Sequence, residues 1–428
     1  MWDEQFFLSE MHKALMPSTG CTEPVAIALN TATARKHARG DVKRLTLTLD
    51  TYLYKNAMGV GIPGADERGV ALCAAMGVTA GDADAQLRVL GHVAPQALQA
   101  AKQMVRDGLV SVRTREDVPE LFVESVLETG EDCVRVITLG SHTNIVGVEH
   151  APFEPYRPQA ACVAQCPIRE STLADMIGFA DRVPAEKLAF LQEGIEMNLA
   201  VADAGRQFGL GLAIDTLIGQ GVIGRSPVSA AQLLCASASY ARMSGISLPV
   251  MTATGSGNQG ITLLLTLEAV ARECRTDPEK KLRAAALANL VNIYVKSYTG
   301  MLSAVCACGV ASGLGASVGV VYMLGGGERQ MLGAMKNILG SISGMICDGA
   351  KEGCANKVEL SSGLAVQAAF LAMNGMSIGM DDGILASDLK ALFENLGQLV
   401  QEGMRETNRV IVDIMQGASK CRDMAADA

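Results

Sequence analysis

The chain has 428 residues, a formal net charge of −9 and an aromatic content of 4%. This length allows two or three domains with a large buried core. Acidic and basic residues are interspersed, which leaves no basic stripe for a nucleic acid and no Lys/Arg cluster for an anionic membrane surface. The composition therefore favours a small-molecule partner. A homo-oligomer is also compatible with this composition.

The N-terminal stretch and the cysteines indicate a compartment. Residues 1–18 carry acids early and are amphipathic, whereas a secretory signal has a basic start followed by an apolar block. We therefore expect a cytoplasmic location. The 12 cysteines are too sparse for a disulfide scaffold, and a reducing compartment keeps them as thiols. Metal binding, catalysis and simple burial remain open for them.

The order of the predicted elements indicates an α+β fold. Alternating and helical patterns are mixed up to a proline-containing stretch at 151–167, after which nearly every segment is helical. We predict a mixed α/β domain at residues 1–160 and a mostly α-helical domain at residues 161–428. The first domain should contain helices at 3–16 and 25–38, a strand at 43–54, helices between 70 and 110, and strands between 109 and 150.

Two charge-free segments, 245–267 and 301–327, are each long enough to cross a bilayer. A membrane transporter with broken helices would show a similar pattern. However, small residues dominate both segments, and the Trp and Tyr residues typical of a membrane interface are nearly absent. We therefore expect helices that are buried on all sides within a soluble domain and packed closely through small residues.

The glycine-rich sequence GSGNQG at 255–260 precedes a helical run. It matches the dinucleotide-binding pattern, but a further helix follows in place of the required second strand. A glycine-rich turn at a helix N-terminus can also bind a carboxylate through its backbone N–H groups. A tight turn between helices explains the pattern equally well. Asn258 is the first side chain to test for substrate binding.

The sequence PSTGCTEP at 17–24 predicts the start of a helix. Thr22 is a suitable N-cap, Glu23 suits the positive end of the helix dipole, and proline is tolerated in a first turn. Cys21 then lies at the helix mouth, a position that favours the thiolate. Cys21 is therefore a candidate base, nucleophile or ligand. Burial as a small residue beside a cap is equally consistent with the pattern.

Four later cysteines could hold a metal centre. Cys306 and Cys308 lie within VCACG, and on a regular helix their side chains would diverge by about 200°, so only one could face a metal. With Cys347 and Cys354 this makes a dispersed set of three thiolates. The spacings match neither zinc ribbons nor ferredoxins, although dispersed cysteines can hold iron–sulfur clusters. Burial is the commoner fate of a cysteine, and spacing alone leaves both readings open.

The loop SHTNI at 141–145 adds two polar candidates. His142 and Asn144 could reach a substrate, although a histidine with satisfied hydrogen bonds in a loop is an alternative. The nucleophile elbow that would support a Ser-His-Asp triad is not found in the sequence.

Four stretches taken together resemble the L-cysteine desulfidase family, which is related to the iron–sulfur L-serine dehydratases. These stretches are STGCTEP (18–24), GSGNQG (255–260), LSAVCACGVASG (302–313) and GMICDGAKEGCANK (344–357). The resemblance implies a four-iron four-sulfur (4Fe–4S) cluster held by three cysteines. It also implies β-elimination of sulfide from L-cysteine, which gives pyruvate, ammonia and hydrogen sulfide.

The same resemblance implies roles for single residues. Cys347 and Cys354 match the family's late pair of ligands, and Cys306 matches the third by motif position, with Cys308 as the alternative. Cys21 matches a cysteine proposed to act as an acid or base near the substrate.

We therefore expect a cytoplasmic, cluster-dependent lyase that acts on L-cysteine. In this hypothesis a low-pKa Cys21 thiolate takes the Cα proton, while a cationic iron stabilises the developing charge. The substrate carboxylate would bind the GSGNQG turn and the backbone of Ser18, Thr19 and Gly20. An L-serine dehydratase is the nearest alternative. A membrane transporter and a thiol or metal-storage protein are alternatives from other classes.

Overall fold

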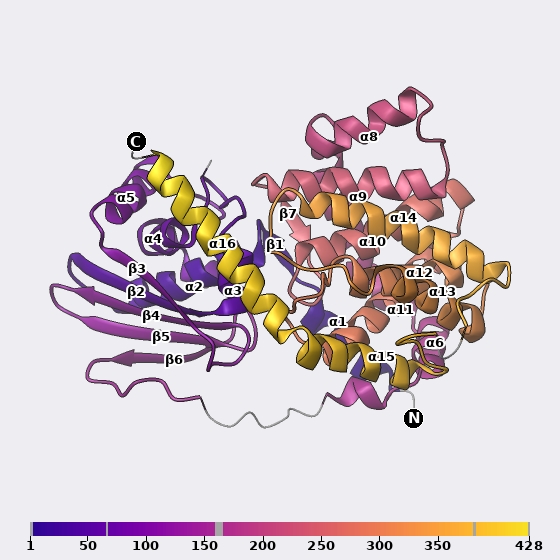
Figure 1. The fold of residues 1–428 in the computed structure, drawn as a ribbon, viewed down its shortest axis with the longest axis horizontal. Coiled ribbons are helices and arrows are strands. Elements are labelled where there is room, and N and C mark those ends of the chain that lie inside the picture. Colours follow the sequence, from indigo (N-terminus) through magenta and orange to yellow (C-terminus); the bar gives the residue numbers. More distant parts are fainter. Residues whose placement is uncertain (1–2, 66, 159–165, 380–381, 427–428) are drawn as a thin grey trace.

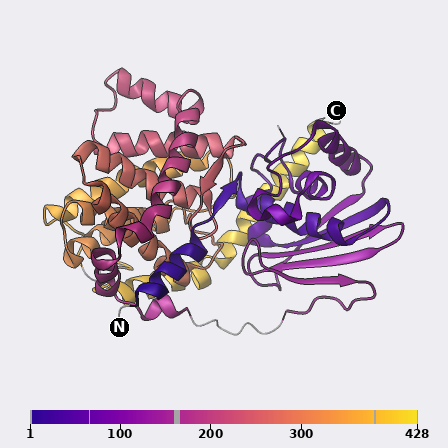
Figure 2. The same cartoon turned by 180° about the vertical axis from the view of Figure 1, so that it is seen from behind.

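The computed structural model describes residues 3–65, 67–158, 166–379 and 382–426, with side chains up to residue 417 in the last stretch. A five-stranded sheet and its covering helices form one part of the molecule, and a bundle of helices forms the other (Figures 1 and 2). The α+β fold class predicted from the sequence is confirmed.

The first part contains α2 (Thr22–His37), β2 (Val42–Asp50), α3 (Thr51–Ala57), α4 (Val70–Ala80), η1 (Ala83–Arg88), α5 (Pro95–Arg106), β3 (Val110–Arg115), β4 (Phe122–Thr129), β5 (Cys133–Leu139) and β6 (Ile145–His150). The strand order is β3-β2-β4-β5-β6, with β2 and β3 parallel and the other neighbours antiparallel. Helix α2 packs between the sheet and α4. Residues 22–34 of α2 are therefore all buried, including its N-terminus.

The second part contains η2 (Pro167–Glu170), α6 (Leu173–Arg182), η3 (Ala185–Leu188), α7 (Ala189–Gly205), α8 (Gly209–Gly219), α9 (Pro227–Met243), β7 (Pro249–Met251), α10 (Gly257–Cys274), α11 (Pro278–Thr299), α12 (Val310–Met323), α13 (Glu328–Ile342), α14 (Cys354–Met373) and α15 (Leu389–Gln398). Small residues allow its helices to approach closely, as predicted. A Cβ atom on Gly315 of α12 would lie 2.4 Å from the carbonyl oxygen of Ala288 in α11.

Both ends of the chain connect the two parts. Helix α1 (Glu4–Ala14) packs on α6 and α11, and strand β1 (Pro17–Thr19) pairs with β7. After the π-helical turn η4 (Leu399–Gly403), helix α16 (Arg405–Ala426) crosses back to α3 (Figure 1). The division at residue 160 stays a prediction, and residues 159–165 lie outside the described residues.

The prediction of two uninterrupted buried helices at 245–267 and 301–327 is wrong. The first segment consists of β7, a turn and the start of α10, and the second is non-helical until α12 begins at Val310. Gly255 and Gly300 adopt φ angles of +79° and +80°, which interrupt a right-handed helix. Among the described residues, none of the helices is long and apolar enough to cross a membrane.

Candidate active site

One pocket collects most of the predicted site residues where the two parts of the molecule meet. About 660 Å³ of space in and around it is free of protein atoms, including solvent at its open mouth. The sheet-containing part supplies Cys21, Glu23, Asn56 and His142 to its wall. The helical part supplies Arg242, Asn258, Cys306, Cys308, Cys347 and Cys354.

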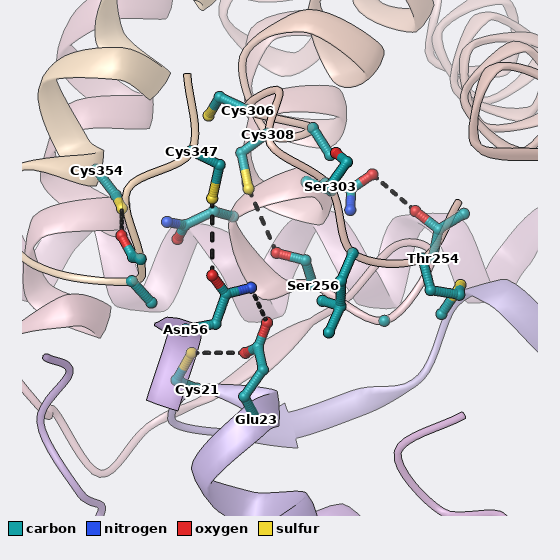
Figure 3. A pocket seen from close by; sticks show the side chains of 18 of the residues that line it. Cys21, Glu23, Asn56, Thr254, Ser256, Ser303, Cys306, Cys308, Cys347 and Cys354 are labelled. Atoms are coloured by element: carbon teal, nitrogen blue, oxygen red, sulfur yellow. Dashed lines mark hydrogen bonds between the residues drawn. The ribbon is translucent and has the colours of Figure 1, made fainter. Parts of the chain in front are cut away.

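Short backbone contacts bring the four later cysteines together (Figure 3). Val305 and Ile346 form an isolated β-bridge, and the N–H of Cys347 donates to the carbonyl oxygen of Ala304 at 2.6 Å. Cys354 is the first residue of α14. Because residues 305–309 are not helical, the divergence expected on a regular helix does not apply, and both Cys306 and Cys308 line the pocket.

Cys306 and Cys308 have different surroundings. The side chain of Cys306 is buried, whereas Cys308 is half-buried and its Sγ lies 3.4 Å from Ser256 Oγ. The carbonyl oxygen of Cys308 accepts a hydrogen bond from Thr262 Oγ1 at 3.1 Å. The deeper position of Cys306 favours it as the third ligand, and the assignment stays a prediction.

The thiols of the pocket influence one another. Burial raises the pKa of Cys354 to about 12, and the neighbouring Cys306 and Cys347 thiols contribute to this rise. The pKa of Cys306 is raised well above its usual value, mainly by a hydrogen bond with Cys308 and secondly by burial. The Cys306 and Cys354 thiols are therefore protonated without metal, so metal binding to them would release protons.

The four later cysteines supply thiolate donors of the kind that hold iron–sulfur clusters. Among the described residues, three or more His, Cys, Asp or Glu side chains never converge closely enough to hold one metal ion. In a cluster, each thiolate binds a different iron, so the ligands surround the group and need not meet at one point. Thiolates gathered around one cavity are the arrangement that a cluster requires.

Two buried lysines give this region a cationic character. Lys55 Nζ donates to Ser303 O (3.2 Å) and Asn408 Oδ1 (2.7 Å), and Lys296 Nζ donates to Met301 O (2.9 Å). Burial lowers the pKa of each lysine, whereas Cys347 and Asp348 raise that of Lys55, and Glu120 followed by the cysteines raises that of Lys296. Buried cations that contact only neutral acceptors are costly unless an anion lies nearby. Asp348 and Glu120 act as nearby anions, and an anionic cluster at the cysteines would add to them.

A chain of hydrogen bonds links Cys21 to the cysteine wall (Figure 3). Cys21 Sγ donates to Glu23 Oε2 at 3.0 Å, and Asn56 Nδ2 donates to Glu23 Oε1 at 3.1 Å. Cys347 Sγ donates to Asn56 Oδ1 at 3.7 Å. This series of hydrogen bonds therefore runs from Cys21 through Glu23 and Asn56 to Cys347, a predicted cluster ligand.

The predicted low-pKa thiolate at Cys21 is wrong. Burial raises the pKa of Cys21 well above its usual value, and the negative charge of Glu23 adds to the rise. Burial would also raise the pKa of Glu23, but His142, the bond from Cys21 and Arg242 hold it below its usual value. The pair therefore exists as a thiol that donates to a carboxylate.

The helix start at Cys21 also differs from the prediction. Cys21 itself is the N-cap of α2 and makes no side-chain cap, while Thr22 is already helical. Thr22 Oγ1 donates to the carbonyl oxygen of Gly255 at 2.7 Å. Its hydroxyl therefore joins the two glycine-containing motifs and is not used to cap the helix.

His142 lies against the GSGNQG turn. A Cβ atom on Gly255 would lie 2.8 Å from the ring carbon Cε1 of His142, so only glycine fits there. The histidine is buried, and its Nε2 atom has no hydrogen-bond partner among the residues that the structure describes. Burial lowers the pKa of His142, although Glu23 opposes this effect. The ring is therefore neutral and has one nitrogen free for a ligand.

The other predicted substrate-binding residues separate into two groups. Asn258 is buried and lines the pocket, where its Oδ1 accepts a bond from Arg242 Nη1 at 3.2 Å. Asn144 is exposed, lies outside the pocket wall and donates to the carbonyl oxygen of Leu139. The geometry gives Asn144 no contact with the pocket, because it closes the β5–β6 turn.

Ser18, Thr19 and Gly20 support the pocket without lining it. Ser18 and Thr19 belong to β1 and pair with Val250 and Pro249 of β7. The carbonyl oxygen of Gly20 accepts a bond from Arg242 Nη2 at 2.9 Å. These residues therefore hold the chain that leads to Cys21.

Sequence reasoning missed Arg242, Asn56, Lys55 and Lys296, and it gave Glu23 only a role at the helix dipole. Arg242 is the only charged residue of α9, and Lys296 follows a long apolar stretch of α11. A charge that follows a long uncharged stretch of helix was the signal that could have found Arg242 and Lys296. It was ambiguous, because a cation near a helix C-terminus also suits the dipole.

Comparison with known proteins identifies the family. A family model described as the serine dehydratase alpha chain matches residues 71–413. A UPF0597 protein of Desulfatibacillum aliphaticivorans is 37% identical over 417 residues, which cover 93% of this chain and 95% of that protein. The chain therefore belongs to the serine dehydratase alpha chain family.

Two further relatives show the same full-length similarity. A UPF0597 protein of Clostridium tetani is 34% identical and covers 96% of this chain and 98% of its own length. One from Alkaliphilus metalliredigens is 35% identical, with coverages of 98% and 96%. The family model supports the serine dehydratase side of the resemblance. The family match includes His142, Arg242 and the four later cysteines, and begins after Cys21.

Proposed function

We propose that this protein is an iron–sulfur-dependent lyase that removes the β-substituent of a small L-amino acid. The observation that carries this proposal is the single pocket in which four thiols face a Cys21–Glu23 pair and a free histidine nitrogen. Membership of the serine dehydratase alpha chain family supports the same reaction type. L-cysteine is the proposed substrate, with L-serine as the alternative.

Cys347, Cys354 and Cys306 would hold a 4Fe–4S cluster, with Cys308 as the alternative to Cys306. Three-cysteine ligation leaves one iron open, and when bound the cluster would supply a Lewis acid toward the leaving group. The wall beside these cysteines includes Met301, Leu302 and Val305. Ser256 and Ser303 belong to the same wall, so the choice of L-cysteine over L-serine rests on the resemblance of the motifs.

The Cys21–Glu23 pair would act as the base. It carries one negative charge in total, so it can accept one proton. Cys21 Sγ takes the Cα proton and passes its own proton to Glu23 across the 3.0 Å bond. The Cα–H electron pair forms the Cα–Cβ double bond, and the Cβ–S bond breaks with its electrons on sulfur. The aminoacrylate product hydrolyses to pyruvate and ammonia without further help.

The test is an anaerobic assay after reconstitution with iron and sulfide. We expect a brown protein that releases sulfide and pyruvate from L-cysteine faster than it releases pyruvate from L-serine. The reverse preference would replace the proposed substrate by L-serine. A protein that stays colourless and is inactive on both substrates would exclude the proposed lyase.

Replacing Glu23 by glutamine should lower kcat/KM about 10²–10⁴-fold, because the amide cannot accept the proton that Cys21 passes on. The cluster absorbance should be unchanged, since Glu23 is not a proposed ligand. Glu273→Gln is the matched control, because Glu273 is an exposed residue of α10. A Glu23→Gln variant with wild-type kcat/KM would contradict the proposed base.

The pH profile should show a requirement for neutral His142. Its pKa lies below the usual 6.5, so lowering the pH protonates the ring only below that value. We assign the binding of the substrate ammonium group to the free Nε2 atom. The imidazolium that forms on protonation would repel this ammonium group. The acid limb of kcat/KM should therefore lie below pH 6.5 and shift in His142→Gln. Cluster absorbance recorded at each pH separates this effect from cluster loss.

A further inference from the structure

Arg242 is a buried cation in the wall of the pocket. It lies in the last turn of α9, and its side chain is only 2% exposed. Arg242 Nη1 donates to Asn258 Oδ1 and Nη2 donates to Gly20 O, so it joins the two segments predicted to bind a carboxylate. Both acceptors are neutral. The guanidinium is therefore oriented, but its charge is not neutralised by these bonds.

Within the part of the chain that the structure describes, the Nε atom of Arg242 has no hydrogen-bond partner. Among the described residues, no carboxylate forms an ion pair with this guanidinium within 4.0 Å. Glu23 acts on the same region only as a nearby charge, since Arg242 lowers the pKa of both Glu23 and Cys21. A buried guanidinium with an unused donor is costly unless an anion completes it. The planar donor set of arginine matches a carboxylate.

The N-terminus of α10 meets Arg242 at Gly257. A Cβ atom there would lie 2.3 Å from Arg242 Nε, so glycine is required for the guanidinium to approach the helix. Ser256 is the N-cap of this 18-residue helix and makes no side-chain cap. The first-turn N–H groups and the positive end of the helix dipole therefore add to the attraction for an anion.

We propose that Arg242 and the N-terminus of α10 bind the α-carboxylate of the substrate, so that the site selects free amino acids over their amides and esters. This inference rests on the proposed function, because it assigns one group of the same substrate. It also fits the proposed base. Arg242 is bonded to Gly20, the residue before Cys21. A carboxylate held by this guanidinium would therefore place the adjacent Cα–H near the Cys21 thiol.

The test compares L-alanine with L-alaninamide, two ligands without a leaving group, by titration calorimetry. We expect the wild-type protein to bind L-alanine at least tenfold more tightly than the amide, as a charge-assisted hydrogen bond would give. In Arg242→Gln this preference should fall to about one, and Arg242→Lys should keep part of it because it retains the charge but loses the planar fork.

Arg275→Gln is the matched control, since Arg275 is exposed at the C-terminal end of α10. It should bind both ligands as the wild type does. Equal wild-type affinity for L-alanine and L-alaninamide would overturn the inference, even if Arg242→Gln failed to fold. An unchanged preference in a folded Arg242→Gln variant would also overturn it. Because binding needs no turnover, an absent lyase activity would contradict the proposed function without deciding this result.

Discussion

Cys347→Ser should lose the iron–sulfur absorbance after anaerobic reconstitution and should have no measurable lyase activity. The thiol of Cys347 donates a hydrogen bond to Asn56. Its backbone N–H donates to the carbonyl oxygen of Ala304, two residues before Cys306, which holds the two proposed ligands near each other. Serine preserves the shape of the residue but removes the thiolate that binds iron. Iron and sulfide content, with the visible spectrum, would measure the loss directly.

The same experiment distinguishes Cys306 from Cys308. Cys306→Ser should behave as Cys347→Ser does, whereas Cys308→Ser should retain the cluster, because Cys308 is less buried and its thiol is already beside Ser256. Cys274→Ser is the matched control, since Cys274 is an exposed cysteine at the end of α10. A Cys347→Ser variant with full iron content and turnover would refute the ligand assignment. Loss of the cluster in Cys308→Ser alone would make Cys308 the third ligand.

The α+β fold could be predicted because its helices and strands follow simple local patterns. The strand predicted at 43–54 corresponds to β2 up to Asp50, whereas residues 51–54 belong to helix α3. The strand signals between 109 and 150 correspond to β3 to β6. The errors occur where small residues carry little pattern. The apolar pattern of residues 301–309 fits a helix and an extended segment equally well. In the structure, the positive φ of Gly300 and the bridge from Val305 to Ile346 show which conformation the segment adopts.

The site could be predicted where a motif carried its residues, and not where residues meet only after folding. Cys306, Cys347 and Cys354 were found through motifs, and the fold then brings them to one pocket. The protonation of Cys21 could not be foreseen, because Glu23 points back at its thiol and burial outweighs the helix dipole. Arg242 depends on a contact with Gly20, which is 222 residues away along the chain.

Lys55→Met should weaken cluster binding about 10–100-fold, the usual effect of losing a group that surrounds a metal site. Lys55 is fully buried in α3 and reaches from the sheet-containing part to Ser303 in the loop before Cys306. Its charge lowers the pKa of Cys347, so it favours the thiolate that would bind iron. Iron release to a chelator, followed by absorbance under anaerobic conditions, would measure the change.

The stability of the metal-free protein separates this electrostatic role from a purely structural one. A buried cation without a charged partner costs free energy, so its replacement by an apolar residue of similar length should leave the metal-free protein at least as stable. Lys336→Met is the matched control, since Lys336 is a buried lysine of α13 outside the pocket wall. It should not change iron release.

Asn408→Leu tests how the C-terminal helix contributes. Asn408 of α16 accepts a hydrogen bond from Lys55 Nζ at 2.7 Å, so its loss leaves the charge in place but frees the side chain to move. We expect faster iron release than in the wild type and slower release than in Lys55→Met. If Lys55→Met destabilised the metal-free protein and left iron release unchanged, Lys55 would be a packing residue, and the balance between buried cations and anionic thiolates would need another explanation.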